Sequence, residues 1–143
     1  MNNKMTLTFL SISENEAFAR NVIASFMLPL NPTLSEISDV KTAVSEAVTN
    51  AIVHGYPDAV GEVELQAEII DNAIHIIISD SGVGIEDVDR ALEPFFTTKS
   101  ESERSGMGFT IMRSFMDKID VKSTQNVGTT IKLSKTINPK IAD

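Results

Sequence analysis

The strand-like segments of this sequence occur as adjacent pairs, and this arrangement limits the possible folds more than any other feature. Residues 62–70 and 73–79 are joined by a DN turn, which predicts a β-hairpin. Residues 119–124 and 129–135 flank the turn-like sequence QNVG. Hairpins break the regular strand–helix–strand alternation of a doubly wound fold. The sequence therefore predicts an α+β protein whose helices pack on one face of a mixed, mostly antiparallel sheet.

The N-terminal third of the chain is predicted to hold one more strand and two helices. Residues 5–12 alternate apolar and polar side chains, as a half-buried strand does. Ser13 with Glu16 and Thr33 with Glu36 have the spacing of capping boxes, in which two side chains satisfy free backbone amides at a helix start. Each pair therefore predicts the beginning of a helix.

The rest of the chain adds one loop and one helix. The second helix keeps its apolar spacing as far as Gly55, which is a natural terminator. Residues 94–106 have no periodicity and are expected to form a mobile loop. Residues 109–118 have helical spacing, so a third helix is expected there.

The composition narrows the class of protein. The chain has 143 residues, 42% of them hydrophobic, which suffices for one core, so residues 1–143 are expected to form a single domain. The net charge of −8 argues against a nucleic-acid partner, because such binding depends on Lys and Arg. The sequence has no cysteine, no signal-peptide pattern and no apolar run long enough to cross a bilayer. A soluble cytoplasmic protein without a membrane partner is expected.

Three polar side chains follow one another at helical spacing in SEAVTNAIVHG. Glu46, Asn50 and His54 are four residues apart in turn, so they lie along one side of the second helix. Their neighbours are small or apolar, and buried polar groups are costly unless they have partners. A solvated face and a functional site both remain possible. In a site, Glu46 could accept a proton and Asn50 could offer an oxygen to Mg²⁺; His54 is expected to be a core histidine or a supporting partner.

A second candidate is the segment IIISDSGVGI, where a strand ends in an acidic residue. Asp80 could accept a hydrogen bond from an exocyclic amine such as that of adenine. Gly82 and Gly84 would let the backbone approach a flat ligand closely. An ordinary Asp-Ser-Gly turn explains this segment equally well when it is taken alone.

A third candidate is the pair Gly106 and Gly108 before the third helix. Amides at a helix start can bind a phosphate, and glycine leaves them accessible. A simple hinge is the alternative. Lys99 and Arg104 in the preceding loop could reach a terminal phosphate, although charged loop residues are usually only solvated.

Several common motifs are missing. There is no P-loop, no dinucleotide-binding glycine motif, no protein-kinase signature and no HExxH zinc motif. His75 lies in a predicted strand and is expected to have no catalytic part.

The three candidates occur in the order and spacing of the GHKL ATP-binding fold, which the chain therefore resembles. The segments SENEAFARNV, KTAVSEAVTNAIVHGY and FFTTKSESERSGMGFTIM further resemble the bacterial anti-sigma serine kinases, the sporulation anti-sigma-F group in particular, over nearly the whole chain. The resemblance implies a two-layer α/β sandwich with a mobile ATP lid.

The resemblance also implies roles for individual residues. Glu46 would be the general base for a serine hydroxyl, Asn50 would bind Mg²⁺, and Asp80 would bind adenine. Arg20 would belong to a surface for protein partners. The implied contacts to ATP or ADP are those of Asn50, Asp80, Gly82, Gly84, Thr97, Thr98, Lys99, Arg104, Ser105, Gly106, Met107, Gly108 and Thr130.

The implied function is that of an anti-sigma factor and protein serine kinase. Such a protein would inhibit a sigma factor of the sigma-F type, phosphorylate a STAS-type anti-anti-sigma protein and form a homodimer. A general-stress kinase of the same family and a nucleotide-dependent binding module without kinase activity are the alternatives.

Overall fold

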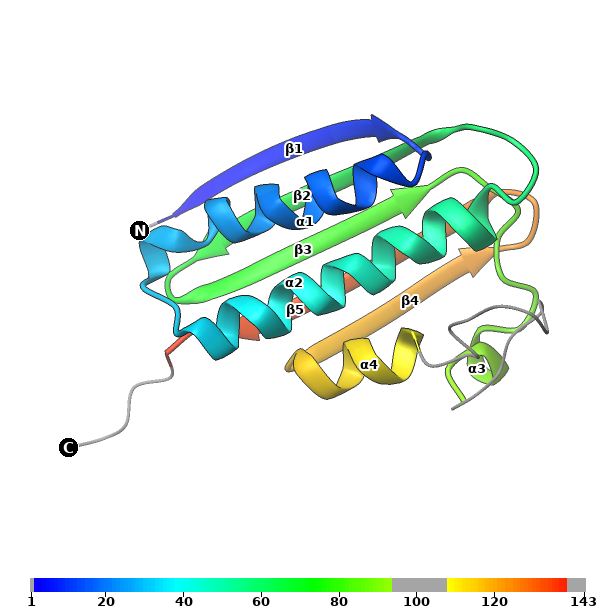
Figure 1. Cartoon of the computed structure of the whole chain (residues 1–143). Helices are drawn as coiled ribbons and strands as arrows, with labels where there is room; N and C mark the ends of the chain where they lie inside the picture. Colours follow the sequence, from blue (N-terminus) through cyan, green and yellow to red (C-terminus); the bar gives the residue numbers. More distant parts are fainter. Residues whose placement is uncertain (1, 94–107, 139–143) are drawn as a thin grey trace.

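Five antiparallel strands form one sheet in this computed structural model, which describes residues 2–93 and 108–138. The strand order is β1-β2-β3-β5-β4, and all four pairings are antiparallel (Figure 1). Both predicted hairpins are confirmed, as β2–β3 and β4–β5. The strands are β1 (Asn3–Leu10), β2 (Glu62–Ile70), β3 (Ala73–Asp80), β4 (Lys118–Thr124) and β5 (Gly128–Thr136).

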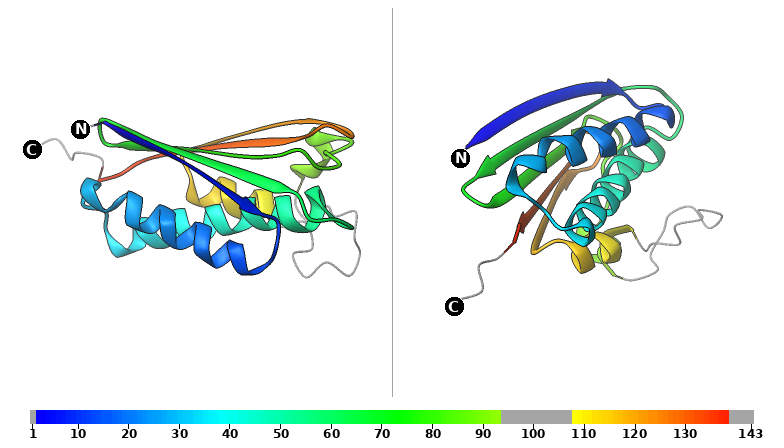
Figure 2. Two further views of the ribbon diagram at one scale, coloured as in Figure 1. Left: turned by 90° about the horizontal axis from the view of Figure 1, so that it is seen from above. Right: turned by 60° about the vertical axis from the view of Figure 1, so that its left-hand side comes forward.

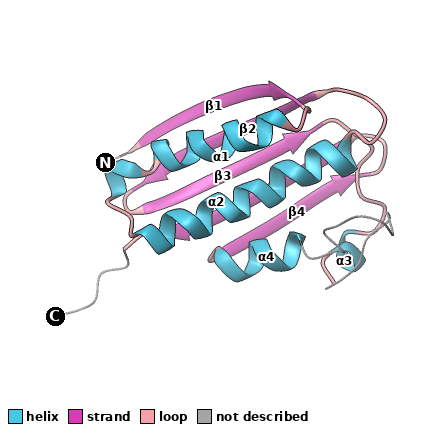
Figure 3. Cartoon of the chain, viewed as in Figure 1, coloured by secondary structure: helices cyan, strands magenta, loops and turns pink. Residues whose placement is uncertain are grey.

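The helices lie on one face of this sheet, as the sequence predicts (Figure 2). Helix α2 packs between α1 and α4, and all three run along the strands. A π-helix continues α2 without a break. The helical elements are α1 (Glu14–Phe26), η1 (Leu28–Leu30), α2 (Leu34–Thr49), the π-helix η2 (Asn50–Gly55), α3 (Val88–Ala91) and α4 (Gly108–Phe115), and Figure 3 separates them from the strands by colour.

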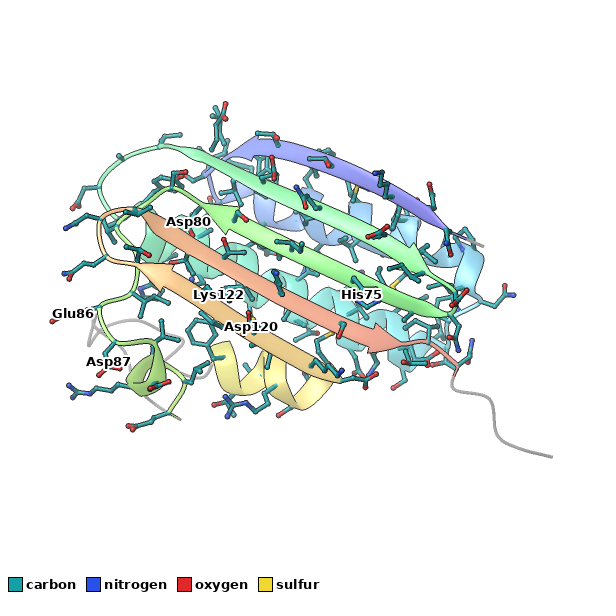
Figure 4. The ribbon with its side chains drawn as sticks, turned by 180° about the vertical axis from the view of Figure 1, so that it is seen from behind. His75, Asp80, Glu86, Asp87, Asp120 and Lys122 are labelled. Atoms are coloured by element: carbon teal, nitrogen blue, oxygen red, sulfur yellow. The ribbon has the colours of Figure 1, made fainter. Side chains whose placement is uncertain are left out.

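The core lies between the sheet and the helices because side chains alternate along each strand. In β2, every second side chain from Val63 to Ile69 is buried, while Glu64 and Glu68 point to the other face. That other face carries mostly polar side chains, among them His75, Asp120 and Lys122 (Figure 4). Only the helix-covered face of the sheet therefore contributes to the core.

Of the two predicted capping boxes, one is confirmed and one is wrong. The Thr33 hydroxyl accepts from the Glu36 amide, and the Glu36 carboxylate accepts from the Thr33 amide. Ser13 instead has helical backbone angles and makes no capping hydrogen bond, because its side chain bonds to Glu14. The Glu16 carboxylate accepts from the Ser45 hydroxyl on α2 at 2.6 Å. The same three-residue spacing thus serves helix initiation at Thr33, whereas at Ser13 its glutamate serves helix packing.

The predicted boundaries in the second half of the chain need one correction. Helix α4 ends at Phe115, three residues before the predicted end, because the chain turns there to enter β4 at Lys118. The predicted loop 94–106 lies outside the described residues. Within the described ranges, none of the helices combines the length and apolarity that a bilayer crossing requires.

Candidate functional site

A cavity of about 430 Å³ opens at the end of the sheet where β3 finishes. Four parts of the chain enclose it: the end of α2 with the π-helix, the segment after β3 with α3, the beginning of α4, and the β4–β5 turn. The residues that line it are Glu46, Thr49, Asn50, His54, Val83, Gly84, Ile85, Glu86, Asp87, Arg90, Ala91, Gly108, Phe109, Met112, Gln125 and Asn126.

The α2 wall of the cavity carries the first predicted group of residues. Glu46, Asn50 and His54 all line the cavity, so the structure brings them together as the helical spacing predicts. Glu46 is only 7% exposed, which excludes a solvated face for this residue. His54 is only partly buried and lines the cavity, so the alternative of a core histidine is wrong, and that of a supporting partner stays a prediction. The π-helix begins at Asn50, and π-turns inside helices are frequent at functional sites.

Asp80 ends β3 and is 9% exposed. Neither Asp80 nor Gly82 is among the residues that line the cavity, whereas Val83 and Gly84, which follow them, are. Asp80 Oδ1 accepts the Gly82 amide at 2.9 Å. Gly82 in turn lies so close to the π-helix that a Cβ there would be 1.9 Å from the Gly55 carbonyl oxygen. Gly55 has the same restriction, because its Cβ would be 2.9 Å from Asp80 Oδ1. The glycines therefore bring the helix backbone directly onto the carboxylate.

Burial is the main influence on the ionisation of Asp80. It raises the pKa of this carboxyl above its usual 3.8, although the backbone amides of Gly82 and Thr129 donate hydrogen bonds that act in the opposite direction. Carboxyl groups whose pKa is shifted in this way are frequent at functional sites.

Asp80→Asn is expected to reduce the pH dependence of stability. Because the folded-state pKa of Asp80 is raised, its contribution to stability is full below pH 3.8 and is lost as the pH rises through the folded-state pKa. Relative to wild type, Asp80→Asn should therefore be more stable at about pH 7 than at about pH 4. Denaturant unfolding without nucleotide measures this, and Asp120→Asn on the exposed sheet face shows the effect of removing an unrelated carboxylate. A relative stability of Asp80→Asn that does not change with pH would contradict the assignment.

The second glycine of the predicted pair shapes another wall of the cavity. Gly84 has a φ of +74°, and a Cβ there would be 2.3 Å from the Thr124 carbonyl oxygen. The Asn126 amide donates to the Val83 carbonyl at 2.6 Å, which fixes the β4–β5 turn against this segment. Gln125 and Asn126 line the cavity, and the sequence analysis missed them because their QNVG segment was interpreted only as a turn.

Thr130 does not lie where the sequence analysis expects it. Asp80 is paired with Thr129, while Thr130 is paired with Ser79 and contacts the Ser79 hydroxyl at 3.4 Å on the opposite face of the sheet. Because side chains alternate along a strand, only Thr129, which is 4% exposed, shares the face of Asp80. The predicted place of Thr130 near the adenine is therefore wrong.

The beginning of α4 closes the remaining side of the cavity. Gly108 is the first residue of this helix and lines the cavity together with Phe109. A Cβ at Gly108 would meet Glu46 Oε1 at 3.3 Å, so the start of α4 lies next to the Glu46 carboxylate. The other predicted residues of this region, Thr97, Thr98, Lys99, Arg104, Ser105, Gly106 and Met107, lie outside the described residues.

The donor set of the cavity suits a metal that is held together with a ligand. In the described part of the chain, there is no group of three or more His, Cys, Asp or Glu side chains able to hold a metal ion. Asn50 offers a neutral amide oxygen inside the cavity. This fits Mg²⁺, which keeps several waters and is usually bound by one or two protein oxygens together with phosphate oxygens.

A separate groove between α1 and α2 reaches the same carboxylate. Its volume is about 540 Å³, and Glu46 lines both this groove and the cavity. Arg20 lines the groove from α1, where its Nε lies 3.5 Å from Glu16 Oε2. Glu46 thus lines both the cavity and a groove that contains the positively charged side chain of Arg20.

Comparisons with known proteins agree with this arrangement. The model of the histidine kinase-like ATPase domain family matches residues 13–135. The chain is 54% identical over 136 residues to the anti-sigma F factor of Caldanaerobacter subterraneus subsp. tengcongensis, covering 95% of each chain. It is 54% identical over 134 residues to the anti-sigma F factor of Clostridium novyi, covering 93% of this chain and 94% of the relative.

Solved structures share the fold at low sequence identity. The crystal structure of the RsbU and RsbW domains of a Mycobacterium tuberculosis protein matches with a TM-score of 0.69 at 18% identity, over 94% of this chain and 32% of that one. The catalytic domain of the histidine kinase ThkA matches with a TM-score of 0.57 at 16% identity, over 93% of this chain and 96% of that one. The chain therefore belongs to the histidine kinase-like ATPase (GHKL) family, in the group of the bacterial anti-sigma F factors.

Proposed function

We propose that this chain binds and inhibits a sigma factor of the sigma-F type and transfers the γ-phosphoryl group of ATP to a serine of a STAS-type anti-anti-sigma protein. The position of Glu46 is the observation that carries the kinase part of the proposal. Glu46 lines both the cavity, whose volume suits a nucleotide, and the groove between α1 and α2. A proton acceptor between two substrates is what a phosphoryl transfer to a hydroxyl requires.

The nucleotide would lie across the cavity, with its base near β3 and its phosphates near α4. Asp80 would accept a hydrogen bond from the adenine amine, since its carboxylate is held by backbone amides on one side. The Gly108 end of α4 would face the phosphates, where helix amides favour negative charge. Gly106, Lys99 and Arg104 are proposed to complete the phosphate site.

The reaction itself would depend mainly on positioning. Glu46 would accept the proton of the serine hydroxyl. The serine oxygen would form a bond to the γ-phosphorus while the bond from that phosphorus to the bridging oxygen of ADP breaks. Asn50 would hold Mg²⁺, which supplies charge neutralisation at the phosphates when it is bound. The products are ADP and the phosphorylated serine.

The surface of α1 is proposed as the partner-binding region. Arg20 and Glu16 line the groove, and Glu16 also joins α1 to Ser45 on α2, next to Glu46 in sequence. A partner that contacts this pair would therefore be close to the proposed base. The names of the anti-sigma F relatives support a sigma factor as one partner. A cytoplasmic homodimer remains part of the proposal.

A transfer assay tests the function directly. The purified chain is incubated with MgATP and a STAS-domain anti-anti-sigma protein, and the intact mass of that protein is measured. We expect one added phosphoryl group on a single serine, and no addition when this serine is replaced by alanine or when ADP replaces ATP.

A different result would separate the alternatives. A chain that binds ATP and a sigma factor but transfers no phosphoryl group would support the nucleotide-dependent binding module. Transfer only to a stress-type partner, with no complex with a sigma-F type factor, would support the general-stress kinase.

A further inference from the structure

The Tyr56 hydroxyl bridges β2 and β3 at the point where the two strands separate. It donates a hydrogen bond to the Glu62 carbonyl at 2.8 Å and accepts one from the Ser81 amide at 2.7 Å. The register pairs Val63 with Asp80, so Glu62 and Ser81 are the next residues to face each other. One phenolic oxygen thus lies between backbone groups that would otherwise continue the ladder.

Both ends of this tyrosine are held in place. Its amide donates to the Ala51 carbonyl at 3.1 Å, immediately after the π-helix. Its ring lies against Gly61, where a Cβ would be 2.3 Å from the ring carbon Cε1. Tyr56 therefore connects the end of the π-helix to the ends of two strands through a fixed side chain.

The segment that Tyr56 holds is the one that carries the carboxylate of the site. Ser81 follows Asp80 directly, and the next amide, that of Gly82, donates to Asp80 Oδ1 at 2.9 Å. The Val83 amide then donates to the carbonyl of Gly55, the residue before Tyr56, at 2.8 Å. Two neighbouring residues of the helix end thus hold the turn after β3 at both of its ends.

We propose that Tyr56 is a positioning residue for base recognition: its hydroxyl ends the β2–β3 ladder at Asp80 and fixes the turn that orients the Asp80 carboxylate. This inference rests on the proposed role of Asp80 as the acceptor for the adenine amine. Tyr56 itself need not touch the nucleotide, because it acts through the Ser81 and Gly82 amides.

The test compares the binding of ADP and inosine diphosphate to the full chain by calorimetry. Inosine diphosphate has a carbonyl in place of the adenine amine, so the wild-type chain should prefer ADP. In Tyr56→Phe the hydroxyl is lost, and we expect the Kd for ADP to rise about three- to tenfold, the usual cost of one or two hydrogen bonds. The Kd for inosine diphosphate should change little, so that the preference for ADP shrinks.

Two further variants separate positioning from a general loss of stability. Thr33→Ala removes the cap at the far end of α2 and should lower stability without changing the preference for ADP. Gly61→Ala should displace the ring while keeping the hydroxyl, and it carries the test if Tyr56→Phe does not fold. It should reduce the preference as Tyr56→Phe does.

The outcomes distinguish this inference from the proposal beneath it. A full wild-type preference in the folded Tyr56 and Gly61 variants would overturn the role of Tyr56 alone. Equal binding of ADP and inosine diphosphate by the wild-type chain would overturn the role of Asp80, and that of Tyr56 with it.

Discussion

Glu46→Gln is expected to lower the rate of phosphoryl transfer by about 10²- to 10⁴-fold, the usual contribution of a general base. Glutamine keeps the shape of the side chain at this buried position, 7% exposed, but cannot accept the proton of the serine hydroxyl. The affinity for MgATP should change by less than about twofold, since the proposed base acts on the acceptor and not on the nucleotide. Single-turnover transfer to the STAS-domain protein and calorimetry with a non-hydrolysable ATP analogue measure the two quantities.

Two matched variants give this result its meaning. Glu86→Gln makes the same chemical change at an exposed carboxylate (Figure 4). Although Glu86 lines the same cavity, its replacement should leave the transfer rate near that of the wild type. Asn50→Ala removes the proposed metal ligand, so it should weaken MgATP binding as well as transfer. If Glu46→Gln and Asn50→Ala lost nucleotide affinity equally, the separate roles of the two residues would be wrong.

The fold was largely predictable because its signals are local. Strand alternation and two short turns identify both hairpins, and the Thr33–Glu36 box begins α2 as expected. Ser13 shows where local patterns fail. Ser13 and Glu16 have the same spacing as Thr33 and Glu36, but the Glu16 carboxylate accepts a hydrogen bond from Ser45, 29 residues away on another helix. A competing tertiary contact of this kind leaves no mark in the local sequence.

The site residues also fall into those that local spacing predicts and those that depend on tertiary structure. The spacing of Glu46, Asn50 and His54 along one helix face is a local property, and all three reach the cavity. Thr130 was assigned without the register of β5 against β3, and only that register shows that Thr129 is on the face of Asp80. The bridging role of Tyr56 depends on Ser81, which is 25 residues away in sequence, so no local motif could reveal it.

Gly82→Ala is expected to damage the site more severely than a methyl group added to Gly84 or Gly108, the two described glycines that line the cavity. The added Cβ would lie 1.9 Å from the Gly55 carbonyl oxygen and 2.4 Å from its carbon, and both are backbone atoms. That carbonyl cannot move freely, because it accepts the Val83 amide at 2.8 Å. Overpacking of this kind costs about 1–3 kcal/mol and occasionally more. We expect a corresponding fall in the free energy of unfolding and a loss of ADP binding, measured by denaturant titration and calorimetry.

Gly108→Ala is the matched control for this change, because it adds the same methyl group at a glycine that lines the cavity. Its Cβ would meet only Glu46 Oε1, at 3.3 Å, and a side-chain oxygen can shift where a backbone carbonyl cannot. Alanine also favours a helix over glycine, so the free energy of unfolding should stay within about 0.5 kcal/mol of wild type or rise. A Gly82→Ala chain as stable as Gly108→Ala would mean that the π-helix and the turn after β3 do not approach each other as closely as the structure shows. The close contact of these two backbones, and not glycine flexibility, is therefore what the pair of variants measures.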